Sequence, residues 1–410
     1  MSRIAGIMRN RRKIHIFGRE RIITEHRDEF YTFGRKKFGP FLFGFVRWLY
    51  AELVKKGYDK VFFFSRDGYM MQKAFALVNK KGISSHYVYF SRKSLQQALL
   101  WRCEDFEDSL RFLPWKHYIS IGDLLCYYGF GSTEREKMAE NGGFDLDDAV
   151  PYDELKHSRL AERLYRENRE RINTASKEQE QLLKAYTEQE DMRGRCAVVD
   201  IGWHGNMQYY LEQFAANNNI DLRPEGFYIG IDPTSSLRSP VSGYMYAPGS
   251  MEHRKHLLCF LGCFEKLLQS TEGSADGYRQ DENGHVLPVL RQYEYENDGD
   301  IIGAIKQWQQ GALDTVKKLC RSDRNIPDSE LTAPLIHFGM YPGMNDVKLF
   351  SFFYNTDGRK TWYTAQKPLY RYRPKELLRD LADSPWKTGF LRSVFRLPFP
   401  YYLIYRILKK

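Results

Sequence analysis

The sequence predicts an α/β fold in which a parallel sheet is flanked by helices, with a helical insertion and a mostly helical C-terminal region. Short continuous apolar runs, such as residues 61–64, alternate with stretches of helical periodicity. That alternation is typical of strands that are covered on both faces and joined by crossover helices. The chain has 410 residues, of which 42% are apolar, so it can bury a large core.

The first predicted unit is a βαβ unit near the N-terminal end of the sheet. A helix at 40–56 that stops at Gly57 precedes it, and its elements are a strand at 59–64, a helix at 69–80 and a strand at 86–90. Residues 95–190 show no further strong strand pattern, and their charged residues recur at helical spacings, which indicates a helical insertion.

Strand patterns return after the insertion, at 196–200 and 226–231, with a helix predicted at 207–216 between them and another at 298–318. We therefore divide the chain into four parts. They are a basic leader at 1–37, an α/β domain at 38–290 with its insertion at about 95–190, a helical and irregular region at 291–383, and a basic aromatic tail at 384–410.

The net charge of +10 is concentrated at the two ends of the chain. Residues 1–37 hold eleven Lys and Arg against four acids, and residues 384–410 hold six Lys and Arg and no acid. Basic ends on a slightly acidic body favour an anionic membrane surface as a partner, and we expect no nucleic acid. The tail has the composition of an interfacial helix pair broken at prolines. The alternative is a terminal helix packed on its own domain.

Cysteine usage and hydropathy predict a cytoplasmic protein. The six cysteines form no C-x-x-C pair and follow no signal-peptide pattern, which fits a reducing compartment. His253, His256, Cys259 and Cys263 are close in sequence, but their spacing matches no structural zinc pattern. No window approaches the roughly 18 to 20 apolar residues of a membrane span. We expect a cytoplasmic protein, peripheral on the inner face of the plasma membrane.

Polar residues follow the first buried strand, at Ser65, Arg66, Asp67 and Gly68. In open parallel sheets ligands bind at this carboxyl end. Arg66 can pair with a phosphate, Asp67 can transfer protons or hold a cation, Ser65 can donate a hydrogen bond, and Gly68 lets the chain turn. The alternative is that Asp67 only caps the following helix.

The second strand also ends in hydroxyl and cationic side chains, Ser91, Arg92 and Lys93. Two neighbouring strands that both end in Ser-Arg predict an anion site, and a phosphate-bearing ligand is the natural candidate. The alternative is an ordinary strand-to-helix turn.

The third strand is followed by a glycine loop with Asp200, Gly202, Trp203, His204 and Gly205. The two glycines allow backbone N–H groups to approach a phosphate, Asp200 can act as a base or bind a sugar hydroxyl, and His204 can transfer protons near neutral pH. The pattern matches neither common nucleotide fingerprint. The alternative is a tight turn with Trp203 packed inward and His204 on the surface.

Glu265 completes the candidate residues. It precedes the segment 270–274, whose small and polar residues suit a loop that closes over a site. The alternative is an ordinary helix acid.

These segments, in this order, resemble the haloacid-dehalogenase-like domain, labelled as a predicted hydrolase, of bacterial capsule, O-antigen and surface-polysaccharide biosynthesis proteins. The motifs are S-R-D-G, S-R-K-S, D-I-G-W-H-G and F-E-K-L-L-Q-S-T-E-G-S, and they cover about residues 38–280. The resemblance implies a haloacid-dehalogenase-like, Rossmann-like sheet.

The chain departs from the wider superfamily at one position. Phosphatases of that superfamily begin with D-x-D, whose first Asp attacks phosphorus beside Mg²⁺. Here Ser65 stands at the first position and Asp67 at the second. The resemblance implies Mg²⁺ at Asp67 and Asp200 as the one candidate cofactor, but Ser65 argues against aspartyl-phosphate chemistry.

We therefore expect an enzyme of cell-surface polysaccharide biosynthesis. The favoured interpretation is a transferase that moves a sugar or sugar-phosphate from a nucleotide-activated donor to a lipid-linked acceptor. Its partners would be a nucleotide sugar or sugar phosphate and a lipid-linked glycan. The alternatives are a phosphohydrolase acting on a sugar phosphate and a catalytically inactive scaffold of glycan assembly.

Overall fold

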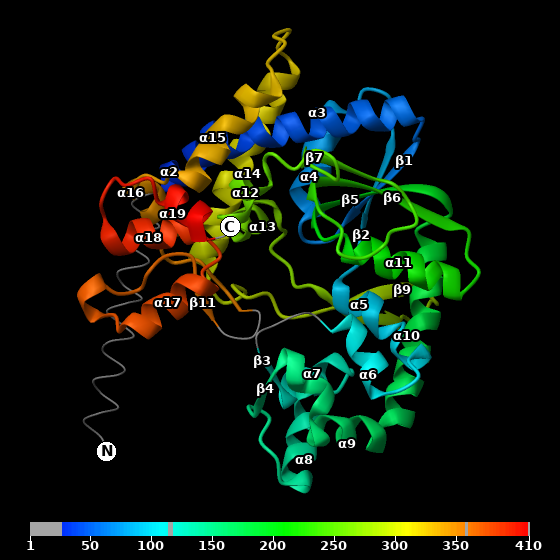
Figure 1. The fold of residues 1–410 in the computed structure, drawn as a ribbon. Coiled ribbons are helices and arrows are strands. Elements are labelled where there is room, and N and C mark those ends of the chain that lie inside the picture. The colour runs from blue at the N-terminus through cyan, green and yellow to red at the C-terminus, as the bar shows by residue number, and fades with distance from the viewer. Residues whose placement is uncertain (1–26, 114–117, 357–359, 409–410) are drawn as a thin grey trace.

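A five-stranded parallel sheet forms the centre of the protein in the computed structural model, which describes residues 27–113, 118–356 and 360–408 (Figure 1). The strand order is β2-β1-β5-β6-β7. The bounds are β1 (Lys60–Phe64), β2 (Ser84–Val88), β5 (Gly194–Trp203), β6 (Leu222–Ile231) and β7 (Val241–Tyr246). The predicted α/β class with a parallel sheet is confirmed.

Strand β1 lies between β2 and β5, the other two strands whose ends carry the predicted site residues. Phe63 is level with Tyr87 of β2 on one side and with Val199 of β5 on the other. Because all three strands run parallel, their carboxyl ends meet at one edge of the sheet, which we call the carboxyl edge. The segments that follow β1, β2 and β5 therefore start at the same edge.

Both faces of the sheet are buried, which explains the continuous apolar strands. Val61 and Phe63 belong to one core and Phe62 and Phe64 to the other, because successive side chains of a strand point to opposite faces. The first core is covered by α3 (Gly39–Lys56), α4 (Gly68–Val78) and α14 (Gly299–Cys320). The second is covered by α5 (Arg92–Gln97), α10 (Arg169–Gln189) and α11 (Asn206–Asn217).

The predicted helical insertion between β2 and β5 is confirmed. Besides α5 and α10 it contains α6 (Phe106–Ser109), α7 (Ile121–Tyr127), α8 (Ser132–Gly142), α9 (Arg159–Glu167) and a short antiparallel pair, β3 (Tyr118–Ser120) with β4 (Ala149–Pro151). In the view of Figure 1, α7, α8 and α9 lie below the sheet. The insertion packs into the same core as α11.

The chain after the sheet contains two short helices, a hairpin and the C-terminal helices. The first of these are α12 (Arg254–Leu258), α13 (Leu261–Leu268) and the hairpin β8 (Ala275–Gln280) with β9 (Val286–Leu290). The C-terminal elements are α14, α15 (Asp328–Met340), α16 (Met344–Phe350), the pair β10 (Tyr354–Asn355) and β11 (Thr361–Trp362), α17 (Pro374–Asp383), α18 (Lys387–Phe395) and α19 (Tyr401–Leu408).

The C-terminal helices share a core with the sheet. Trp308 of α14, Trp386 and Tyr402 are buried in the same apolar cluster as Phe63. At the other end of the chain α2 (Arg27–Phe33) and the π-helix η1 (Gly34–Phe38) pack against α14. Residues 1–26 of the predicted basic leader lie outside the described residues.

Most predicted elements are present, with shifted ends. The strand predicted at 86–90 begins and ends two residues earlier, and the one predicted at 196–200 extends to Trp203. The strand β7 and the β8–β9 hairpin were not predicted. All six cysteines are free thiols, and no helix of the described segments is long and apolar enough to span a bilayer.

Candidate functional site

The turn after β1 places Asp67 at the carboxyl edge without using it as a helix cap. Arg66 adopts a left-handed conformation with φ 67°, and its backbone N–H donates to the Tyr87 hydroxyl at 2.8 Å. The side chain of Asp67 makes no capping hydrogen bond to α4. The simple capping interpretation of Asp67 is therefore wrong, and the carboxylate is available for chemistry.

Asp200 lies on β5 just beyond the last residue of that strand that pairs with β1. We predicted a loop starting at Asp200, but the strand continues because Gly202 pairs with Gly230 and Trp203 with Ile231 of β6. Gly202 has φ 106°, and a Cβ there would lie 2.3 Å from the Gly230 carbonyl oxygen. Only glycine allows the two strands to approach so closely at this position.

Asp67 and Asp200 are electrostatically coupled at this edge. Burial and the negative charges of Asp200 and Glu265 raise the pKa of Asp67 well above its ordinary value, against the opposing charges of Arg66 and Lys266. Burial also raises the pKa of Asp200, to about 6, although hydrogen bonds from the backbone of Ile201 and Gly202 lower it. Both residues are half-buried. Burial and mutual repulsion of the two carboxyl groups disfavour the state in which both are ionised, so the pair can act as acid and base together.

Glu265 reaches the same edge from α13. The indole Nε1 of Trp203 donates to a Glu265 oxygen at 3.2 Å, and the Trp203 ring stacks with Tyr246 at 6.4 Å between centroids. Trp203 is thus both a packing residue and a partner of Glu265. Since Glu265 raises the pKa of Asp67 and of Asp200, it belongs to the site rather than to an ordinary helix surface.

A buried lysine lies next to Glu265 in sequence. Lys266 is fully buried, forms an ion pair with Glu294 and hydrogen-bonds to Gln269 at 3.2 Å. Burial lowers its pKa, and Glu294 opposes that effect. Lys266 lowers the pKa of Asp67 in turn, so it supplies positive charge close to that carboxyl group.

Arg66 holds the segment that we predicted as a closing loop. Its guanidinium donates to Ser274 at 3.0 Å, to Gln269 at 2.8 Å and to Glu294 at 3.3 Å. Its carbonyl oxygen accepts from the Ser270 N–H at 3.0 Å. In this structure Arg66 therefore anchors residues 269–274 across the carboxyl edge, and its side chain is engaged by protein rather than turned toward a phosphate.

Of the polar residues that follow β2, Ser91 and Lys93 contact other parts of the protein, whereas Arg92 is exposed. The Ser91 hydroxyl accepts from the Ser94 N–H at 3.0 Å, as a helix cap, and donates to the Ala275 carbonyl at 2.6 Å. Lys93 pairs with Asp276 at 3.1 Å. Arg92 is exposed and lowers the pKa of Asp200. Of the cations predicted at this strand end, Arg92 is therefore the one that acts on a carboxylate of the site.

His204 and Gly205 form the turn that leads into α11. Gly205 is the residue before the helix, with φ 69°. His204 is exposed, and its Nδ1 lies 3.4 Å from the Asp232 carbonyl oxygen. The groups with the largest effects on the pKa values of Asp67 and Asp200 do not include His204.

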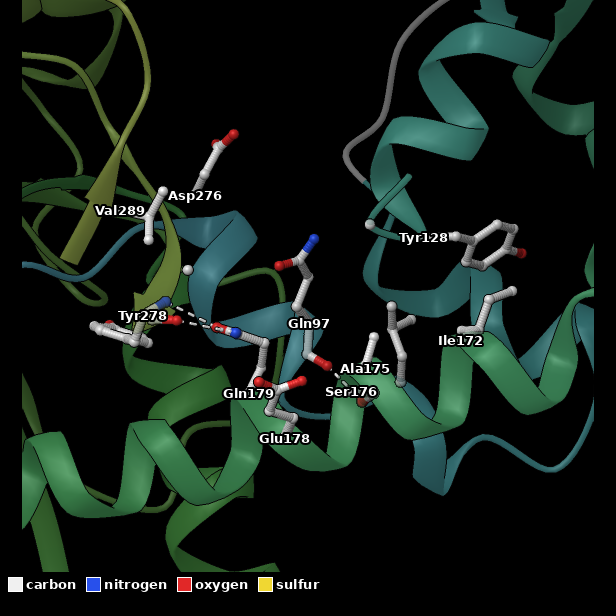
Figure 2. A pocket seen from close by; sticks show the side chains of 13 residues that line it. Gln97, Tyr128, Ile172, Ala175, Ser176, Glu178, Gln179, Asp276, Tyr278 and Val289 are labelled. Carbon is white, nitrogen blue, oxygen red and sulfur yellow. Dashed lines mark hydrogen bonds between the residues drawn. The ribbon is translucent and has the colours of Figure 1, made fainter. Parts of the chain in front are cut away.

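A pocket of about 210 Å³ lies beside the site, between the insertion and the β8–β9 hairpin (Figure 2). Gln97 lies in its centre, with Tyr128 and Ile172 on one side and Tyr278 on the other. The residues that line it include the acids Glu178 and Asp276 and no Lys or Arg.

The pocket is joined to the carboxyl edge by helix α5. With a rise of 1.5 Å per residue, Gln97 lies roughly 8 Å along the helix from Arg92. Asp276, which lines the pocket, is also the ion-pair partner of Lys93. A ligand of modest length can therefore contact both places.

The donor set at the carboxyl edge can be compared with the needs of Mg²⁺. Within the residues that the structure describes, no three His, Cys, Asp or Glu side chains form a metal-binding group. Mg²⁺ usually takes only one or two protein carboxylates and completes its shell with water and substrate phosphate. Asp67 and Asp200 supply the two carboxylates that such a site needs.

Several residues of the site were not predicted from the sequence. Lys266, Gln269, Glu272 and Glu294 reach the edge from segments far from the three strand ends. Lys266 follows an acid and precedes two leucines, which gives no signal of its burial, and Glu294 lies between two tyrosines without any recognisable motif.

Comparison of the sequence with models of protein families and with curated proteins gives no match. The function of the protein is therefore inferred from the geometry of the carboxyl edge and from the residues found there.

Proposed function

We propose that the protein is a transferase of cell-surface polysaccharide biosynthesis that moves a sugar or sugar-phosphate from a nucleotide-activated donor to a lipid-linked acceptor. The observation that carries the proposal is the coupled pair Asp67 and Asp200 at the carboxyl edge. The resemblance of the strand-end motifs to haloacid-dehalogenase-like proteins of surface-polysaccharide synthesis supports the choice of substrate class.

In the proposed reaction Asp200 is the general base. A carboxylate with a pKa of about 6 is ionised at neutral pH and is still basic enough to take a proton. The acceptor hydroxyl attacks the anomeric carbon of the donor sugar, its proton passes to Asp200, and the bond between that carbon and the phosphate oxygen breaks. The nucleoside diphosphate leaves with the bonding electrons.

Asp67 is the protonated partner in this scheme. Its raised pKa keeps a proton on the carboxyl group when Asp200 is ionised, so it can donate a hydrogen bond to the phosphate that leaves. Arg92 supplies positive charge on the exposed side. A bound Mg²⁺ would be held by Asp67 and Asp200 in their ionised forms and would neutralise charge on the diphosphate, in place of the hydrogen bond from a protonated Asp67.

Ser65 supports transfer over hydrolysis through an aspartyl-phosphate. Ser65 is buried, and its hydroxyl donates to the Phe90 carbonyl oxygen at 3.2 Å. The position that would supply the nucleophile of a phosphatase therefore carries a neutral side chain that already has a partner.

The pocket around Gln97 suits the uncharged saccharide part of a substrate. Its lining offers amide and carboxylate groups for hydroxyls and apolar side chains for the ring, and its two acids and lack of cations disfavour a phosphate. A lipid-linked acceptor also places the reaction in the cytoplasm, on the inner face of the plasma membrane.

The test combines a ligand screen with product identification. Purified protein is screened by thermal shift against nucleotide sugars and sugar phosphates, with and without Mg²⁺, because a ligand that binds the native state raises the melting temperature. Consumption of a nucleotide sugar with release of nucleoside diphosphate supports the proposal. Release of inorganic phosphate from a sugar phosphate would show a hydrolase instead.

The decisive variant is Asp200→Asn, with Asp221→Asn as its matched control. Asp221 is exposed at the opposite, amino end of β6, so its substitution changes charge without touching the site. We expect Asp200→Asn to lower kcat by about 10²- to 10⁴-fold. An Asp200→Asn variant as active as the control would overturn the proposal, because Asp200 could then not be the base.

A further inference from the structure

The connection between the last two helices and the outer side of α19 form an exposed apolar surface. Phe395, Leu397, Phe399, Leu403 and Ile407 are between 39% and 67% exposed. The described residues contain thirteen exposed large hydrophobic side chains, and these five fall within thirteen consecutive positions. Such clustering marks an interaction surface rather than scattered surface residues.

Helix α19 is apolar on two sides. Tyr402 and Tyr405 are buried in the core that the helix shares with the sheet. Leu403 and Ile407, one helical turn apart, point the other way and are exposed. A helix that is apolar on both sides is covered on both sides in its working state. Among the residues that the structure describes, the protein itself covers only the inner side.

The connection before α19 is held in a defined shape. The rings of Phe395 and Phe399 contact Tyr401, at 6.0 and 5.5 Å between centroids. Arg396 turns the chain with φ 59°. Leu397 is thereby held at the exposed turn between α18 and α19, with 63% of its surface exposed.

The charges around this surface are positive. Arg396 and Arg406 are exposed beside the apolar residues, and residues 384–410 contain no acid. Two acids of the neighbouring helix α17 are already ion-paired, Glu376 with Lys367 and Asp380 with Arg379. An anionic lipid headgroup layer above an apolar interior is the complement of such a surface.

We propose that this apolar-basic face, made of residues 395–399 with Leu403, Arg406 and Ile407, binds the surface of an anionic bilayer. Helix α19 lies along the interface, because its eight residues span only roughly 12 Å and a bilayer core is about 30 Å thick. The face deepens the membrane location on which the proposed function rests, but its test does not use the reaction.

The experiment is sedimentation of the full-length chain with vesicles of phosphatidylcholine that contain roughly a third of phosphatidylglycerol, beside vesicles of phosphatidylcholine alone. We expect the wild type to bind the anionic vesicles. Leu397→Ser combined with Ile407→Ser should lower binding roughly tenfold. Arg396→Gln combined with Arg406→Gln should lower binding to the anionic vesicles by roughly fivefold for each charge, and should leave neutral vesicles unaffected.

A matched control removes the same number of exposed apolar side chains from a different part of the surface. Tyr370→Ser combined with Leu378→Ser removes two side chains that are 81% and 66% exposed but lie outside the face, and this variant should bind like the wild type. All substituted residues are exposed, so circular dichroism and melting temperature should not change.

Two outcomes would overturn the proposal. In the first, the wild type fails to bind the anionic vesicles or the face variants bind as well as it does. In the second, the face joins two copies of the chain. Leu397→Ser would then change the elution volume of the protein in size-exclusion chromatography without lipid, and it would leave vesicle binding unchanged. Asp200→Asn should bind vesicles like the wild type, so a failed reaction and a failed membrane contact are told apart.

Discussion

Asp200 raises the pKa of Asp67 across the carboxyl edge of two adjacent parallel strands. The two carboxyl groups come from segments 133 positions apart, and the pairing of β1 with β5 brings them together. Their burial disfavours two simultaneous negative charges, so the edge holds a proton at a pH where isolated carboxyl groups have lost theirs.

The first prediction concerns the pH dependence of activity. If Asp200 is the base, kcat/KM should rise as pH increases through about 6, because the ionised form of Asp200 becomes populated there. Initial rates with the nucleotide sugar found in the screen, measured between pH 4.5 and 8 (roughly the range on either side of that pKa), give the profile. A rate that stays flat through pH 6 would remove Asp200 from the role of base.

The second prediction concerns stability. The pKa of Asp200 is about 6 in the folded protein and 3.8 for the unperturbed group, so the native state binds more protons than the unfolded state between these values. Stability therefore falls as pH rises through this window, by about 3 kcal/mol in total. Asp200→Asn should be more stable than the wild type by up to about that amount at pH 8 and nearly equal to it below pH 4. Urea unfolding at both pH values measures the difference, and a difference independent of pH would contradict it.

The sheet could be predicted because its signals are local. Residues 61–64 and 196–199 are continuous apolar runs, and such runs are typical of strands that are covered on both faces. Strand β7 was missed because its Val-Ser-Gly-Tyr-Met-Tyr sequence carries glycine and serine, and only pairing with β6 makes it a strand. In the hairpin, β8 was hidden by its polar residues, and β9 was hidden by Pro288, since proline inside an apolar run argues against a strand.

The site could be predicted only in part, for a similar reason. Asp67 and Asp200 follow recognisable strands, so their common edge follows from parallel pairing. The role of Arg66 could not be read, because its partners Gln269, Ser274 and Glu294 come from segments more than 200 positions away. Sequence spacing carries no information about contacts of that range.

The third prediction separates transfer from covalent phosphatase chemistry. Ser65→Ala removes one buried hydrogen bond to the Phe90 carbonyl and no charge. We expect a loss of stability of about 1 kcal/mol and a kcat within a few-fold of the wild type. Urea unfolding and steady-state kinetics measure the two effects. Complete loss of activity with normal folding would instead make Ser65 a reacting group.

The fourth prediction concerns the buried ion pair between Lys266 and Glu294. Glu294→Gln leaves Lys266 as a buried charge without its carboxylate partner, which should cost about 3 kcal/mol of stability at pH 7. The native state then holds the Lys266 proton less tightly than the unfolded state, so stability should recover as pH rises toward 10 (about the ordinary pKa of lysine). Chemical unfolding at several pH values follows this recovery.

A second substitution serves as the control for that prediction. Lys266→Met in the Glu294→Gln background removes the unpaired charge and keeps an apolar chain of similar length, so it should restore most of the lost stability. A double variant as unstable as Glu294→Gln alone would mean that packing, rather than charge, explains the loss.

The last prediction tests the pocket around Gln97 as the saccharide site. Ala175 lines the pocket from α10, so Ala175→Leu should fill part of its volume of about 210 Å³. Thr174→Leu places the same side chain on the neighbouring, exposed position and is the matched control. Because the chemistry at Asp200 is untouched, Ala175→Leu should raise the KM for the acceptor about tenfold or more while kcat changes little. An unchanged KM, with both variants folded, would place the saccharide elsewhere along the carboxyl edge.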